Sequence, residues 1–151
     1  MKKEDVYARM MHTPDDPVRA GLRAALRDAW KQLLPLHRAL IDAASAEYTA
    51  TVAPVSGPGH LLSLLQEDPF FEWLRPLTSL IVDIDSASRT DFEREDVDAL
   101  VKRIERLFGT GADAGFAARY VPILQRDIDV AAGHAALRKI VRRLLPTPQD
   151  T

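Results

Sequence analysis

Two ionisable residues, Asp127 and His134, stand in an otherwise apolar series near the end of the sequence. The spacing alternates between four and three residues along this series: Phe116, Tyr120, Ile123, Asp127, Val130, His134, Leu137, Val141 and Leu144. On an α-helix, positions seven residues apart differ in direction by only about 20°. We therefore expect Asp127 and His134 to face the same partner helix as their apolar neighbours. His37 lies close to the apolar stripe of an earlier helix, so the three groups can converge inside a bundle.

Imidazole and carboxylate groups that face inward from several helices can bind a divalent metal or a small ligand, or exchange protons. Asp127 and His134 are roughly 10 Å apart along a helix axis, which is too far for both to bind one ion. Neither His37 nor His134 has a His, Asp or Glu three or four residues away, the spacing at which one helix supplies two ligands. The favoured interpretation is therefore structural: each polar group bonds across the bundle and helps to determine which helices pair. We expect no cofactor, and a divalent metal site at these three residues is the alternative.

Four basic residues cluster near the end of the same predicted helix: Arg138, Lys139, Arg142 and Arg143. Such a cluster can contact phosphate groups, but the helix macrodipole also favours cations near a helix C-terminus. The chain has 20 basic and 22 acidic residues and a net charge of −2, so it has no overall positive field to attract nucleic acid. Nucleic-acid binding is therefore only the third function considered, and we do not expect it.

Three residues are candidates for a protein interface. Phe71 points about 100° away from Phe70 on a helix, outside the inner stripe that Phe70 begins with Trp73, so it can contact another helix or a subunit. Tyr120 belongs to the apolar series. Arg138 can lay its aliphatic stem along the apolar surface while its charged group reaches water.

The composition is that of a soluble, folded protein. The chain has 151 residues, of which 46% are hydrophobic and 28% charged, which excludes the signature of disorder and fits one domain. It has no cysteine, which excludes disulfides and thiolate chemistry. No segment reaches the ~18 consecutive apolar residues of a membrane span, and the first residues lack the apolar run of a secretory signal. We expect a cytoplasmic protein that does not enter the membrane.

Helical periodicity recurs along the whole chain, and no strand-like alternation appears. We predict an all-α fold: a polar tail over residues 1–14, one bundle of about five helices over residues 15–146, and a second tail over residues 147–151. The first and last helices should be long. The first begins after Asp16, a good N-cap that precedes a proline. Several helices should kink or break at internal prolines: Pro35, Pro76 and Pro122.

Two later boundaries are predicted from local motifs. Thr90 and Glu93 match a capping box and predict the start of a helix. The segment 109–115, GTGADAG, differs by one position from the phosphate-binding Gly-x-Gly-x-x-Gly pattern and does not follow a strand, so it predicts a linker. A last helix should then run from about Ala114 to Leu145 with a bend at Pro122.

These observations favour a small, non-catalytic interaction or regulatory module with a protein partner. The module can associate with itself through the apolar series or through the aromatic-rich helix that contains Phe71. The alternative is a bundle that binds a metal or small ligand through His37, Asp127 and His134.

Overall fold

The computed structural model describes residues 14–109 and 113–146 of the chain. Over these residues the protein forms six α-helices and one 3₁₀ helix and has no strand, which confirms the predicted all-α fold. The elements are α2 (Pro17–Thr51), α3 (Pro58–Glu67), η1 (Pro69–Leu74), α4 (Arg75–Arg89), α5 (Arg94–Phe108), α6 (Ala114–Arg126) and α7 (Ile128–Leu144). The two predicted tails, 1–14 and 147–151, lie outside the described residues except for Pro14.

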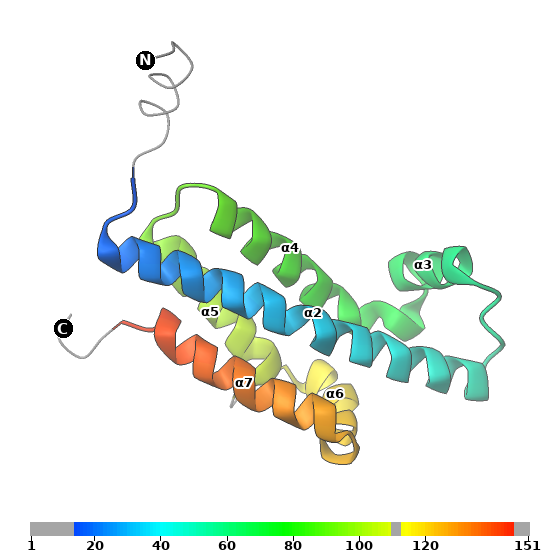
Figure 1. Ribbon diagram of the computed structural model, residues 1–151. Coiled ribbons are helices and arrows are strands. Elements are labelled where there is room, and N and C mark those ends of the chain that lie inside the picture. Colours follow the sequence, from blue (N-terminus) through cyan, green and yellow to red (C-terminus); the bar gives the residue numbers. More distant parts are fainter. Residues whose placement is uncertain (1–13, 110–112, 147–151) are drawn as a thin grey trace, which may run out of the picture.

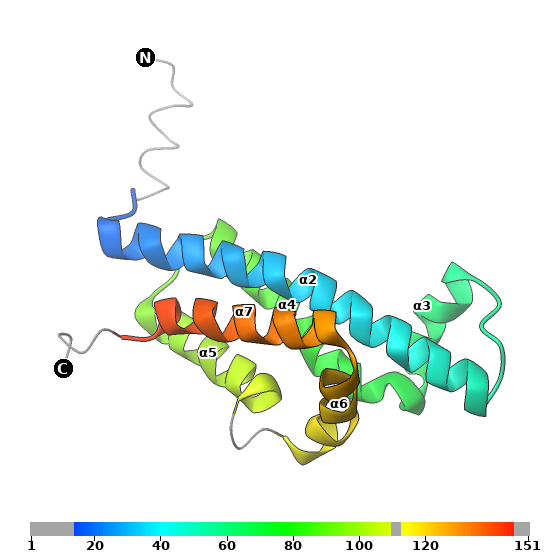
Figure 2. The same ribbon diagram turned by 60° about the horizontal axis from the view of Figure 1, so that its bottom comes forward.

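Four of the helices form an antiparallel bundle (Figures 1 and 2). α2 contacts α4 on one side and α7 on the other, and α5 contacts the same two helices, which closes the ring. Neighbouring bundle helices run in opposite directions, as in an up-down-up-down arrangement (Figures 1 and 2). α3 and η1 lie near the C-terminal end of α2, and α6 leads into the start of α7 (Figure 1).

One apolar core runs through the bundle, and its largest side chains are almost completely buried. Each bundle helix supplies residues to this core at helical spacing: Leu26, Leu33 and Leu40 from α2, Leu77, Leu80 and Ile84 from α4, Val97 and Ile104 from α5, and Leu137 and Leu144 from α7. Burying a side chain of this size stabilises the fold by about 1.5–3 kcal/mol. None of the described helices is both long and apolar enough to cross a membrane.

A kink or a break was predicted at Pro35, and α2 is not broken there. It runs from Pro17 to Thr51, and its cap is the predicted one: Asp16 Oδ1 accepts a hydrogen bond of 2.8 Å from the Arg19 N–H. A proline inside a helix leaves the carbonyl four residues earlier without its donor. Pro35 and Lys31, which carries that carbonyl, are both exposed, so water can bond to the freed oxygen.

The predicted capping box at Thr90 is wrong, because it lies three residues too early. α5 begins after Glu93, whose N–H donates a hydrogen bond of 2.8 Å to Asp96 Oδ2. Thr90 instead ends α4, and its hydroxyl donates to the Ser86 carbonyl at 3.0 Å. The sequence offers two overlapping capping patterns, Thr90 with Glu93 and Glu93 with Asp96, and the helix uses the second. The buried Phe92 lies between Thr90 and Glu93.

The predicted last helix is two helices, and the break lies at Asp127 rather than at Pro122. Asp127 has extended backbone angles, and its Oδ1 accepts hydrogen bonds from the Asp129 and Val130 N–H groups at 2.9 and 3.2 Å. It therefore caps α7, and the expectation that it faces a partner helix is wrong. The apolar series continues on both sides of the break because α6 and α7 each bury their own part of it.

α7 packs tightly against α2 at Gly133. A Cβ atom at this position would lie 2.8 Å from Leu36 Cδ1 and 3.2 Å from Gln32 Nε2. The absence of a side chain therefore lets the two helices pack together at this point.

Candidate functional site

The structure gives His37, Asp127 and His134 separate partners. His37 is half-buried on α2, and its Nε2 lies 2.9 Å from Thr78 Oγ1 on α4. Because the Thr78 hydroxyl donates to the Leu74 carbonyl at 3.2 Å, the His37 Nε2–H donates to that hydroxyl. Burial lowers the pKa of His37 and favours its neutral form.

His134 belongs to an aromatic cluster at the junction of α6 and α7. Its Nδ1 lies 2.7 Å from the Tyr120 hydroxyl, and its ring packs against Phe108. Burial and the nearby charge of Arg138 lower the pKa of His134, and burial raises the pKa of Tyr120. In the tautomer of neutral His134 that carries its proton on Nε2, the Tyr120 hydroxyl donates to Nδ1.

Each of the two histidines bonds to a residue of a neighbouring helix, and their structural interpretation stays a prediction. Among the described residues, no three His, Asp or Glu side chains lie close enough together to hold a metal ion. His37 bonds to α4, His134 to α6, and Asp127 to its own helix α7, so the three do not form one site.

The three interface candidates all make contacts within the chain. Phe71 is fully buried and packs against Tyr48, so it offers no surface to another subunit. Tyr120 is also buried, and the Arg138 guanidinium forms an ion pair with Glu105 of α5. The apolar series that was expected to mediate self-association therefore contributes to the core of the chain itself.

The position of Phe71 follows from the geometry of η1. In a 3₁₀ helix, residues i and i+3 lie on the same side. Phe71 and Leu74 consequently share the buried face, and the predicted inner stripe of Phe70 and Trp73 is displaced by one residue. Phe70 and Trp73 remain only half-buried, at the edge of the core.

The basic cluster at the end of α7 is partly neutralised. Arg143 Nη1 lies 2.7 Å from Asp28 Oδ2 of α2, and Arg138 pairs with Glu105. Lys139 and Arg142 are exposed. Two of the four cations thus stabilise helix packing, which leaves little charge to collect phosphates.

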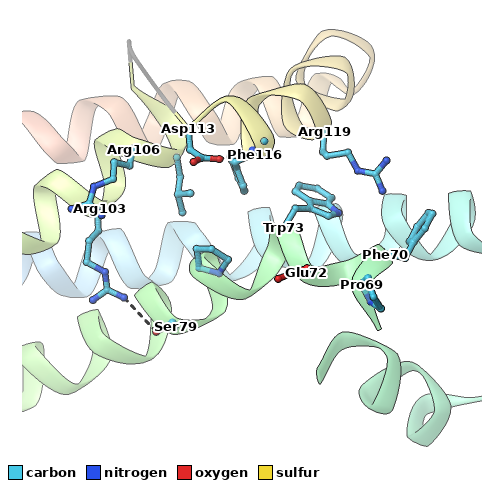
Figure 3. A pocket seen from close by; sticks show the side chains of 13 residues that line it. Pro69, Phe70, Glu72, Trp73, Ser79, Arg103, Arg106, Asp113, Phe116 and Arg119 are labelled. Atoms are coloured by element: carbon cyan, nitrogen blue, oxygen red, sulfur yellow. Dashed lines mark hydrogen bonds between the residues drawn. The ribbon is translucent and has the colours of Figure 1, made fainter. Parts of the chain in front are cut away.

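A groove of about 580 Å³ lies between η1, the start of α4, α5 and α6 (Figure 3). This volume lies within the ~300–1,000 Å³ that ligand sites usually have. Its apolar lining consists of Pro69, Phe70, Trp73, Pro76, Leu107 and Phe116. The rings of Trp73 and the buried Phe116 are 5.6 Å apart between centroids, so Phe116 packs against the Trp73 ring.

Three arginines line the same groove, and their side chains differ in their contacts. Arg103 of α5 pairs with Asp83 at 2.6 Å. The Arg119 guanidinium of α6 lies 5.0 Å from the centroid of the Phe70 ring, and its Nη1 is 3.6 Å from Glu47 Oε1. The exposed Arg106 side chain has no partner within the described part of the chain.

Trp73 adds an unsatisfied donor to the groove. Its indole Nε1 is buried, and no acceptor for it exists among residues 14–109 and 113–146. Buried polar groups are nearly always paired, so such a donor calls for an explanation. Trp73 lines the groove with other atoms of its ring, since the nitrogen itself is buried from solvent.

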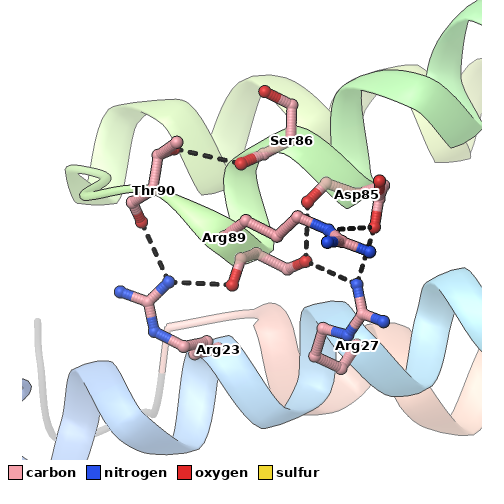
Figure 4. A network of polar contacts seen from close by, with 7 residues as sticks. Arg23, Arg27, Asp85, Ser86, Arg89 and Thr90 are labelled. Atoms are coloured by element: carbon pink, nitrogen blue, oxygen red, sulfur yellow. Dashed lines mark hydrogen bonds and ion pairs between the residues drawn. The ribbon is translucent and has the colours of Figure 1, made fainter.

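A second polar cluster, between α2 and α4, contains Arg23 and Arg27 (Figure 4). Arg23 Nη1 donates to the carbonyls of Ser88 and Thr90 at 2.9 Å each. Its Nε donates to Asp15 Oδ2 at 2.7 Å. With the bond of 3.1 Å from Nη2 to Asp15 Oδ1, they use most of the guanidinium donors and satisfy carbonyls at the C-terminal end of α4.

Arg27 completes this cluster through Asp85. Its Nη1 lies 2.7 Å from Asp85 Oδ1, which also accepts from Arg89 Nε at 2.9 Å. The hydrogen bonds from Arg89 and Arg27 lower the pKa of Asp85. Two guanidinium groups share the Asp85 carboxylate, and Arg27 Nη1 also donates to Ser88 Oγ at 3.0 Å, so the cluster joins α2 to α4.

The groove was missed from the sequence because its residues belong to three distant segments. Two signals were present: the aromatic residues between Pro69 and Pro76, and the arginines Arg103 and Arg106, spaced three apart on one helix. Asp113 and Gly115 of the predicted linker also line it.

No protein-family model matches this sequence, and neither a curated protein nor a solved structure matches the chain.

Proposed function

We propose that this chain is a non-catalytic interaction module that recognises a segment of a partner protein in the groove between η1, α4, α5 and α6. The observation that carries the proposal is the combination of Trp73, Phe70 and the arginines on one concave surface. Trp, Tyr and Arg contribute most of the binding energy at protein interfaces, usually from the centre of the contact. Aromatic residues and arginine are also enriched in interfaces generally.

Preorganisation supports the same proposal. Phe116 is almost fully buried beside Trp73, and Arg119 rests on the Phe70 ring, so neighbouring groups hold the rings in place. Rings that are already held in position lose little conformational entropy when a partner segment binds to them. Self-association through the apolar series or through the aromatic-rich helix stays a prediction, which sedimentation across a wide concentration range tests.

The test is selection of random linear peptides on the immobilised chain. Trp73→Leu removes the indole but keeps apolar bulk, and Trp30→Leu, at the other tryptophan on α2 outside the groove, is the matched control. We expect selected peptides whose affinity falls about tenfold or more with Trp73→Leu, equivalent to ~1.4 kcal/mol, and is unchanged with Trp30→Leu. Circular dichroism checks that both variants remain helical. If no selected peptide distinguishes the two variants, the proposal is wrong.

A further inference from the structure

The groove is bounded by cations at both ends. Figure 3 shows Arg103 and Arg106 of α5 on one side, Arg119 of α6 on the other, and Trp73 and Phe116 between them. A ligand that follows the groove therefore meets guanidinium groups at one end, the Trp73 ring, and a further guanidinium group at the other end.

The groups that line the groove offer many donors and few free acceptors. Its three guanidinium groups face two carboxylates, Glu72 and Asp113. The Asp113 carboxylate already accepts a hydrogen bond of 3.0 Å from the Phe116 N–H, as the cap of α6. The buried Trp73 N–H lacks an acceptor among the described residues. Asp83 and Glu47 pair with two of the guanidinium groups from outside the groove, so a ligand that bonds to the remaining guanidinium donors must supply acceptors, which carboxylates do.

The guanidinium groups are available to different degrees. Arg106 is exposed and makes no side-chain contact within the described segments, so binding an anion breaks no existing bond there. The Arg119 ion pair with Glu47 is long, at 3.6 Å, and part of the Glu47 side chain is exposed to water. Such a pair stabilises the fold little, and a second carboxylate can replace or join it. Arg103 is held by Asp83 and is the least available.

We infer that the partner segment recognised in this groove is acidic, with carboxylate side chains on both sides of an apolar side chain that packs on Trp73. The inference rests on the proposed function, and it specifies the chemistry of the partner. Arginine binds carboxylates with charge-assisted hydrogen bonds, which are often bidentate because the guanidinium and the carboxylate are both planar. A neutral side chain does not offer arginine bonds of this strength. The protein as a whole has a net charge of −2, so the attraction is local and screened by salt.

The test uses peptides obtained by the selection described above, each made together with an isosteric version in which Gln and Asn replace Glu and Asp. Arg106→Gln removes the free guanidinium from an exposed position, where folding is not at risk. Lys102→Gln removes a cation from an exposed position on the same helix that does not line the groove.

We expect the groove-binding peptides to be rich in Asp and Glu and to bind about tenfold more weakly as amide versions. Arg106→Gln should weaken the acidic peptides by a similar factor and leave the amide versions unchanged, whereas Lys102→Gln should alter neither. Groove-binding peptides that are neutral, or whose amide versions bind equally well, would overturn the inference while leaving the proposed function intact. If no peptide depends on Trp73, the proposed function fails, and the inference fails with it.

Discussion

Replacing Asp127 by alanine tests whether this residue is a helix cap. The substitution removes the acceptor for the Asp129 and Val130 N–H groups, which now bond to Asp127 Oδ1 at 2.9 and 3.2 Å. Losing such a cap costs about 0.5–2 kcal/mol, and losing its negative charge near the positive end of α7 costs about 0.3–1 kcal/mol. We expect the free energy of unfolding to fall by about 1–2 kcal/mol. For a chain of this size, Tm should fall by about 3–6 °C.

Urea denaturation followed by circular dichroism measures this change, and two further substitutions define its cause. Asp127→Asn keeps the capping oxygen and should recover most of the stability, losing only the charge effect. Asp129→Ala removes an exposed acid from the same first turn that caps nothing, so it should cost about 0.5 kcal/mol. A loss of about 3 kcal/mol or more that Asp127→Asn does not restore would refute the cap, because it would indicate a buried counter-charge left unpaired.

Three other perturbations have definite expected outcomes. Arg23→Ala should lower the free energy of unfolding by about 3 kcal/mol, since it removes the donor for the Asp15 carboxylate and for the Ser88 and Thr90 carbonyls. A loss below about 1 kcal/mol in urea denaturation would show that these hydrogen bonds of Arg23 do not stabilise the fold. Because the pKa of His134 is lowered in the folded protein, the unfolded chain binds a proton more readily, and the free energy of unfolding should decrease as the pH falls from about 7 to about 5. His134→Gln should reduce this slope, and an unchanged slope would count against the assignment. Gly133→Val should cost about 1–3 kcal/mol by pushing against Leu36, with Gly133→Ala costing less, and a stabilising valine would show that the helices can separate freely.

Local sequence signals determined the helical class and several boundaries correctly. Asp16 followed by a proline marks the start of α2, and a helix begins at Ala114 as expected. These features depend on residues that are neighbours in sequence, so periodicity and capping chemistry are sufficient to predict them.

The break at Asp127 could not be distinguished by the same reasoning. An aspartate in an apolar series is consistent both with a polar residue inside a long helix and with an N-cap between two helices that bury the same face. The first interpretation was favoured because the spacing from Phe116 to Leu144 is uninterrupted, and only tertiary packing separates the two.

The candidate site depended even more on tertiary structure. The 3₁₀ geometry of η1 moves Phe71 into the core and leaves Trp73 at its edge, and no periodicity argument anticipates that change. The arginines come from α5 and α6, so their convergence on Trp73 follows from the way the helices pack.

The indole signals of the two tryptophans give the most direct test of recognition in the groove. Trp73 lines the groove, whereas Trp30 lies on α2 under the Arg27 guanidinium, 4.5 Å from its ring centroid. A ¹H–¹⁵N spectrum of the full chain should contain one indole N–H signal from each, and Trp30→Leu assigns them. When a selected acidic peptide is added, we expect the Trp73 signal to shift, because a side chain that packs on the Trp73 ring changes the surroundings of its N–H, while the Trp30 signal stays in place. A bound peptide that leaves the Trp73 signal unmoved would contradict the account.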